Sequence, residues 1–78
     1  RFIIIGRSSC PFCIRSIDFC NAIGSPVIFL DYEENQEILE EYKQFHDHLT
    51  VPIVLSNHLE TGLTRKLGGF DELVASLK

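Results

Sequence analysis

Tryptophan and methionine are absent from this 78-residue chain, and cysteine and proline each occur only three times. No apolar run approaches the roughly 20 residues that a membrane-spanning helix needs, so we expect no membrane segment. The formal net charge is −4 and no basic stripe is present, which argues against a nucleic-acid partner because nothing is arranged to neutralise phosphates. No repeat, linker or low-complexity stretch divides the chain. The sequence therefore predicts one small domain over residues 1–78.

The small number of cysteines argues against two structural roles. The disulfide framework of a small secreted protein normally uses an even number of cysteines, and this chain has three. A structural zinc site needs four ligands, and His46 and His48 lack the three-to-five-residue gap between the histidines of a zinc finger. We therefore expect no metal site. Two of the cysteines instead form a Cys-Pro-Phe-Cys motif after the apolar run 2–5, which favours a redox-active dithiol.

The motif Cys10-Pro11-Phe12-Cys13 is expected to open a helix. Cys10 then lies at the N-cap, where unpaired backbone N–H groups and the helix dipole favour a thiolate. Its thiolate is the predicted nucleophile that forms a mixed disulfide with a substrate, and the less exposed Cys13 resolves it. Arg7 is predicted to add positive charge near the sulfur; the alternative is a solvated loop arginine.

Apolar periodicity predicts the other elements. Strands are expected at 2–5, 27–30, 53–55 and 63–67, and helices at 11–23, 36–48 and 72–77. Because the runs 2–5 and 27–30 are continuously apolar, both are predicted to be buried on both faces, with the second strand central in the sheet. They form a strand–helix–strand unit and should therefore pair in parallel. The strand 63–67 is predicted to be an antiparallel edge strand.

The helices are predicted to bury one face each. The expected inward residues are Cys13, Ile14, Ile17 and Cys20, then Ile38, Leu39, Tyr42, Phe45 and Leu49, and finally Phe70, Leu73, Val74 and Leu77, with Ser16 among the outward residues. Gly24 is the predicted C-cap of the first helix, and Asn35 and Asp71 are the predicted N-caps of the others. Cys20 lies about 10 Å from Cys13 along the helix, too far for a disulfide. It is predicted to be a core residue, with regulatory oxidation as the alternative.

Three motifs in this order resemble a dithiol glutaredoxin of the thioredoxin-like superfamily. They are Cys10-Pro11-Phe12-Cys13 after the first strand, Thr50-Val51-Pro52 before the third, and Gly68-Gly69-Phe70-Asp71 at the final helix. The resemblance covers nearly the whole chain and implies an α/β fold, with a four-stranded mixed sheet flanked by three helices in the order strand-helix-strand-helix-strand-strand-helix. It also implies a cis Val51–Pro52 bond, which the spacing alone leaves open.

The resemblance further implies a glutathione site. The Val51 backbone would pair with the cysteinyl part of glutathione in the manner of an added strand, and the γ-glutamyl end would lie at Gly69, Phe70 and Asp71. Asp71 could accept from the ligand ammonium, or serve only as an N-cap. The predicted glutathione-binding residues are Arg7, Phe12, Thr50, Val51, Pro52, Gly69, Phe70 and Asp71.

Several residues depart from the family pattern. Arg7 stands where the family usually has lysine, and Phe12 replaces a common tyrosine. His48 and Leu49 replace polar or basic residues that often assist the ligand carboxylate, with Gln44 or His46 as candidates to compensate. The segment between Pro52 and Gly68 is several residues longer than the usual hairpin, and it is predicted to be either a lengthened turn or a loop that contacts protein substrates.

We therefore predict an enzyme, a glutathione-dependent thiol–disulfide oxidoreductase acting in electron transport. It would reduce protein disulfides and glutathione mixed disulfides with glutathione as co-substrate and no tightly bound cofactor. A ribonucleotide reductase is a reasonable family-level substrate. The reactive dithiol and the unpaired third cysteine suit a reducing compartment, so we expect a cytoplasmic protein. We expect a monomer because the sequence shows no large exposed apolar stripe. Because the chain starts at Arg1 and enters a strand at once, we expect that preceding residues were removed.

Three alternatives stay open. A redoxin reduced by thioredoxin reductase is one, but such proteins carry a Trp-Ser-Gly-Phe-Arg-Pro type segment where this chain has Gly-Gly-Phe-Asp. An iron–sulfur carrier would hold a cluster with Cys10 and glutathione from two chains, and Pro11 is unfavourable for that role in the family. A non-catalytic glutathione-binding domain, like the first domain of a glutathione transferase, is disfavoured by the intact dithiol.

Overall fold

Four strands and three helices alternate along the chain in the computed structural model, which describes residues 1–77. In chain order they are β1 (Phe2–Gly6), α1 (Pro11–Ala22), β2 (Val27–Asp31), α2 (Gln36–Phe45), β3 (Ile53–Asn57), β4 (Thr64–Gly68) and α3 (Phe70–Ala75). The predicted order of elements is confirmed. The largest differences are that α2 ends three residues earlier than predicted, that α3 begins and ends two residues earlier, and that β3 ends two residues later.

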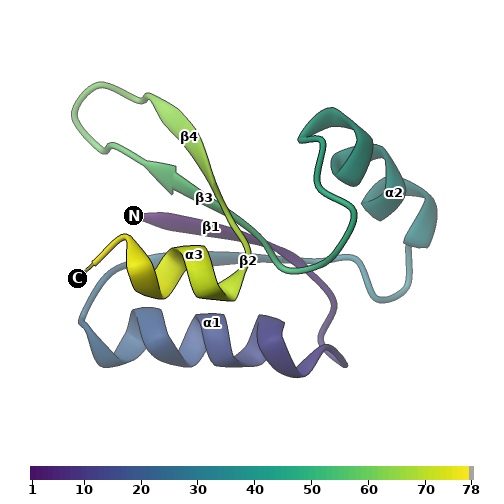
Figure 1. Ribbon diagram of the computed structural model, residues 1–78, viewed down its shortest axis with the longest axis horizontal. Helices are drawn as coiled ribbons and strands as arrows, with labels where there is room; N and C mark the ends of the chain where they lie inside the picture. The colour runs from purple at the N-terminus through teal and green to yellow at the C-terminus, as the bar shows by residue number, and fades with distance from the viewer. Residues whose placement is uncertain (78) are drawn as a thin grey trace.

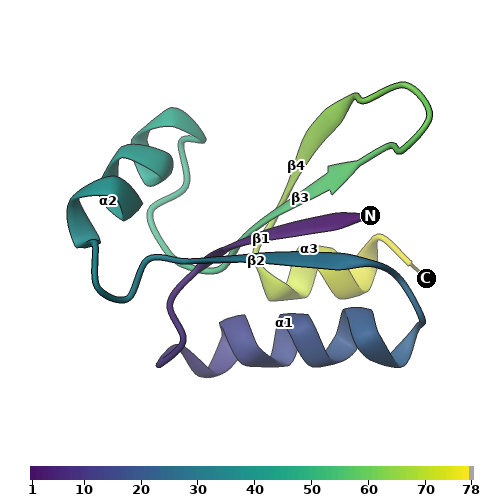
Figure 2. The same cartoon turned by 180° about the vertical axis from the view of Figure 1, so that it is seen from behind.

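The sheet is mixed, as predicted, and has the strand order β2-β1-β3-β4. β1 pairs in parallel with β2, with Phe2 opposite Val27, and in antiparallel fashion with β3, with Phe2 opposite Ser56. β3 and β4 form an antiparallel hairpin with a register shift at Val54/Leu55. Figures 1 and 2 show α1 and α3 side by side on one face of the sheet and α2 on the other.

The prediction that the second strand is central is wrong, because β2 lies at one edge of the sheet and pairs only with β1. Its apolar character has another cause. Val27 and Phe29 pack against the core on the α1 side, while Leu30 packs against the core on the α2 side. The predicted burial on both faces is only partly correct, because Ile28 is exposed on this edge strand. A continuous apolar run therefore does not indicate a neighbour on both edges of a strand.

The sheet separates two apolar clusters. The first joins α1 and α3 to the sheet through Phe2, Ile4, Cys20, Val54 and Leu73. The second joins α2 to the sheet through Ile5, Leu39, Ile53 and Leu55. Successive side chains of a strand point to opposite faces, which is why the adjacent Ile4 and Ile5 belong to different clusters. Cys20 is completely buried, so its predicted core position is confirmed.

Several predicted helix faces and caps need correction. Ser16 is fully buried instead of outward, because its hydroxyl donates to Phe12 O at 2.7 Å and so needs no water. The predicted inward residues Ile14, Phe45, Leu49 and Leu77 are exposed, and the latter three lie at or beyond the C-terminal end of their helices. The C-cap of α1 is Ile23, and Gly24 follows it with φ of 72°.

The other predicted caps have different outcomes. Asn35 caps α2 as predicted, because its side chain accepts from Ile38 N. Asp71 is not the N-cap of α3; Gly69 holds that position, and the Glu72 carboxylate accepts from Gly69 N at 3.2 Å. A glutamate at the third helical position can thus satisfy the amide of a cap residue that has no side chain.

Leu39 should hold α2 to the sheet, because it is the fully buried side chain of this helix. We expect Leu39→Ala to lower the free energy of unfolding by about 2–5 kcal/mol, the usual cost of truncating a buried leucine. Phe45→Ala is the matched control on the same helix, where the ring is 83% exposed. It should change stability by less than about 0.5 kcal/mol in chemical denaturation. Equal losses in the two variants would contradict packing through Leu39.

Candidate active site

Cys10 is the N-cap residue of α1 and has extended backbone angles, φ −84° and ψ 117°. Its Sγ accepts a hydrogen bond from Cys13 N at 3.3 Å, and Pro11 occupies the first helical turn as predicted. On its other side the sulfur lies 3.9 Å from Val51 O. The Val51–Pro52 bond is cis, as the resemblance implied. The sulfur of Cys10 is thus placed between the first turn of α1 and the segment that enters β3.

The two motif cysteines differ in environment. Cys13 has no exposed surface, whereas Cys10 is 7% exposed, so only Cys10 can be reached from solvent without movement. Burial raises the pKa of Cys13 from 9.0 to about 12, and the hydrogen bond and the negative charge of Cys10 act in the same direction. The Arg7 backbone and charge offset part of that increase in the pKa of Cys13. All three cysteines are free thiols.

A groove of about 210 Å³ lies between Phe12 of α1, the segment that enters β3 and the start of α3. It brings together seven of the eight predicted glutathione residues: Phe12, Thr50, Val51, Pro52, Gly69, Phe70 and Asp71. The rings of Phe12 and Phe70 are 5.9 Å apart, so they join α1 to α3 beside the groove. Arg7 does not line the groove, although its charge acts on the nearby Cys13 thiol.

Two groove residues were not predicted as ligand contacts, His48 and Glu72. The spacing of Glu72 three residues after a helix cap is a capping signal that could have identified its role at Gly69. His48 was noted only as a departure from the family pattern. Its Nε2 atom is buried and has no hydrogen-bond partner in the described part of the chain. Sequence spacing gives no indication of such an atom, because its burial depends on the path of segment 46–52.

The loop that leads to Cys10 is fixed by two carboxylates. Ser8 N donates to Asp31 Oδ1 and Ser9 N donates to Glu33 Oε1, each at 3.0 Å. Asp31 Oδ1 also accepts from Glu33 N, and this bond, together with those from Ser8, lowers the pKa of Asp31. Acidic residues after β2 therefore hold the nucleophile's loop in place.

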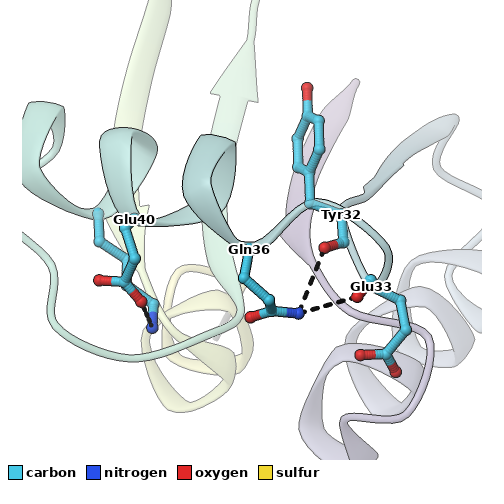
Figure 3. Close-up of polar contacts among 5 residues, drawn as sticks. Tyr32, Glu33, Gln36 and Glu40 are labelled. Atoms are coloured by element: carbon cyan, nitrogen blue, oxygen red, sulfur yellow. Dashed lines mark hydrogen bonds and ion pairs between the residues drawn. The ribbon is translucent and has the colours of Figure 1, made fainter.

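The first turn of α2 forms hydrogen bonds with the same acidic segment, which follows β2. The Gln36 side-chain amide donates to Glu33 O at 2.9 Å and to Tyr32 O at 3.4 Å (Figure 3). Glu40 and Lys43 form an ion pair further along α2 at 3.0 Å. The connection between β2 and α2 is thus tied both to the helix that follows it and to the loop before Cys10.

A second hollow, of about 410 Å³, lies along α2 and is lined by Ile38, Glu41, Tyr42, Phe45 and His46. His46 therefore lies outside the groove beside Cys10, and it does not replace the family's basic residue there. Burial lowers the pKa of His46, and the nearby Lys66 and His48 lower it further. The imidazole of His46 is consequently held toward its neutral form.

Across residues 1–77, no group of three or more histidine, cysteine, aspartate or glutamate side chains could hold a metal ion. In the same part of the chain, none of the helices combines the length and the apolar character needed to cross a membrane.

Comparisons with known proteins agree with the architecture. No protein-family model matches the sequence, and no curated protein matches it. A crystal structure of a wheat glutaredoxin matches with a TM-score of 0.78 at 22% sequence identity, over 95% of this chain and 66% of the wheat chain. The chain thus spans just under two thirds of the length of that structure. With its mixed sheet, its three helices and its dithiol at the start of α1, this chain has the glutaredoxin form of the thioredoxin-like fold.

Proposed function

We propose that the protein is a thiol–disulfide oxidoreductase that uses glutathione to reduce glutathione mixed disulfides and protein disulfides. The observation that carries this proposal is the position of the Cys10 sulfur. It accepts from Cys13 N at the start of α1, it is the more accessible of the two thiols, and it lies 3.9 Å from the carbonyl oxygen of Val51, a residue that lines the groove. A sulfur anion in that position is stabilised by the amide and by the helix dipole.

The reaction begins when the Cys10 thiolate attacks one sulfur of a substrate disulfide. A Cys10–substrate disulfide forms, the substrate disulfide breaks, and the other substrate sulfur leaves as a thiolate that takes a proton from water. With a protein disulfide, Cys13 then gives up its proton and attacks the Cys10 sulfur. This step forms the Cys10–Cys13 disulfide and releases the second substrate thiolate. Two glutathione molecules reduce that disulfide and leave as glutathione disulfide.

The raised pKa of Cys13 explains why attack by Cys10 precedes attack by Cys13. Because Cys13 stays protonated, Cys10 is the thiol that attacks the substrate first. Once Cys10 is part of a mixed disulfide, its negative charge and its hydrogen bond no longer raise the pKa of Cys13. The resolving thiol therefore loses its proton more readily when its reaction is required.

Three features of the groove support a glutathione ligand. Val51 offers backbone groups beside the Cys10 sulfur, which suits the cysteinyl part of the ligand. Phe70 and Asp71 occupy the first two positions of α3, where N–H groups have no intrahelical acceptor. The exposed Asp71 carboxylate can accept from the ligand ammonium. We also propose that the protein acts on disulfide-containing proteins in the cytoplasm, where conditions are reducing.

Two cysteine variants test the proposal. We expect Cys10→Ser to lose all activity toward the mixed disulfide of glutathione and hydroxyethanethiol, in an assay coupled to glutathione reductase. Cys13→Ser should keep turnover because glutathione itself can attack the Cys10 mixed disulfide. Far-UV circular dichroism of both variants serves as the folding control. A parent protein that is inactive with glutathione but is reduced by thioredoxin reductase would overturn the glutathione assignment.

A further inference from the structure

His48 has a buried side-chain atom that the steps above do not use. Its Nε2 has no accessible surface and no hydrogen-bond partner among residues 1–77. A buried polar atom without a partner is unfavourable, so such atoms commonly mark a position that a ligand or a water completes. The main chain holds the residue in place, because His48 N donates to Lys43 O at 2.9 Å.

The unpaired Nε2 faces the groove at Gly69. A Cβ built on Gly69 would lie 3.8 Å from this Nε2 and 3.7 Å from Pro52 O. Because glycine has no side chain, no Cβ stands between the His48 imidazole and the start of α3, and both residues line the groove. A ligand group that enters at Gly69 would therefore meet a free imidazole nitrogen.

The charged and polar side chains near Gly69 indicate which chemical group of a ligand would bind there. Asp71 forms no hydrogen bond or ion pair with other residues in the described part of the chain, whereas Glu72 is already bonded to Gly69 N. The Asp71 carboxylate suits an ammonium, and an imidazole N–H suits a carboxylate. A ligand terminus that carries both charges on one carbon, an α-amino acid group, satisfies both residues.

We propose that His48 is a specificity-determining residue whose Nε2–H donates to the α-carboxylate of the ligand's terminal amino acid, while Asp71 binds the ammonium. This inference rests on the proposed function, and it identifies the γ-glutamyl end as the part of glutathione that His48 contacts. It differs from a general charge effect, because a single nitrogen in a fixed position makes the contact.

Binding of S-methylglutathione tests the inference without any turnover. We expect His48→Leu to raise the dissociation constant about tenfold or more, as expected for loss of a hydrogen bond to a charged group. His48→Gln, whose amide can still donate, should restore most of the affinity. His58→Leu, in the exposed turn between β3 and β4, is the matched control and should leave the affinity unchanged. Titrations followed by NMR give all four constants.

A second ligand separates recognition from a structural effect. S-methyl-cysteinylglycine lacks the γ-glutamyl group, so His48→Leu should not weaken its binding. Equal losses for the two ligands, or no loss for either, would overturn the inference. His48→Leu should also unfold at no lower denaturant concentration than the parent, since it replaces an unpaired polar atom by an apolar group.

Turnover of the parent protein is judged separately. If binding of S-methylglutathione depends on His48 but no disulfide is reduced, the proposed enzymatic function fails and the inference stands. If turnover is normal and binding is insensitive to His48→Leu, only the inference fails. A parent protein that does not bind S-methylglutathione would overturn both.

Discussion

Between pH 9.0 and about 10.5 the parent protein is expected to lose about 2 kcal/mol more stability than the Cys13→Ser variant. The cause is the complete burial of Cys13, which raises the pKa of its thiol from 9.0 to about 12 in the folded state. The measurement is chemical denaturation at several pH values in the presence of a reductant. Serine is the matched replacement, because its hydroxyl has a similar shape and does not ionise in this range.

The sign of the effect follows from proton binding. In the unfolded chain the Cys13 thiol ionises near pH 9.0, whereas in the folded chain it stays protonated until about pH 12. Between these values the unfolded state binds fewer protons than the folded state, so stability falls as the pH rises. Below pH 9.0 the contribution of Cys13 to stability is fully present.

Other groups also titrate at alkaline pH, and the comparison removes them. Burial raises the pKa of Cys20, and the hydrogen bond with Tyr42 raises the pKa of Tyr32. Both groups are present in the parent and in Cys13→Ser, so their contributions cancel in the difference between the two proteins. Parallel stability curves above pH 9.0 would contradict the raised pKa of Cys13 and, with it, the order of steps proposed for the dithiol.

Sequence patterns predicted where the helices and strands lie better than they predicted which strands are neighbours and which side chains are buried. The apolar runs, the proline at the start of α1 and the Asn35 cap are local signals, and each of them located an element. The edge position of β2 was missed because it depends on which strand β1 takes as its second partner, a choice made by residues far away in the chain. The burial of Ser16 was missed because its polarity is satisfied within its own helix.

In the candidate site, too, features set by local sequence were predicted and features set by distant contacts were missed. Seven of the eight expected ligand residues meet in one groove because they belong to motifs whose local backbone is specified by cysteine, proline and glycine. The unpaired nitrogen of His48 and the carboxylates of Asp31 and Glu33 depend instead on how two loops pass the start of α1. Asp31 and Glu33 accept the amides of the loop before Cys10, although they lie more than twenty residues further along the chain.

Gly6→Ala is expected to lower the free energy of unfolding by about 1–3 kcal/mol, the usual cost of adding a methyl group to a filled interior. A Cβ at this position would overlap the Sγ of Cys13 and lie 3.7 Å from the Cβ of Val51. The main chain has little freedom to move away, because Gly6 pairs with Asp31 in the sheet and its carbonyl accepts from Tyr32 N at 2.9 Å. The Cys13 sulfur must therefore shift.

A double-mutant cycle assigns this cost to the sulfur. Cys13→Ala removes the atom that the new methyl group would meet, so Gly6→Ala should cost at least about 1 kcal/mol less in that background than in the parent. Gly69→Ala is the matched control, because its Cβ would make only ordinary contacts at 3.7 Å and 3.8 Å. An equal cost of Gly6→Ala in both backgrounds would show that the clash with Cys13 is not its cause.

The same displacement should separate the two activities of the proposed enzyme. Reduction of a glutathione mixed disulfide needs only Cys10, so Gly6→Ala should retain it, as Cys13→Ser does. Reduction of a protein disulfide needs the Cys13 sulfur in line with the Cys10 mixed disulfide, and a shifted sulfur should slow that step. Loss of both activities in a folded Gly6→Ala protein would mean that Gly6 also positions Cys10. Loss of protein-disulfide reduction alone would show that the absence of a side chain at the end of β1 places the resolving thiol.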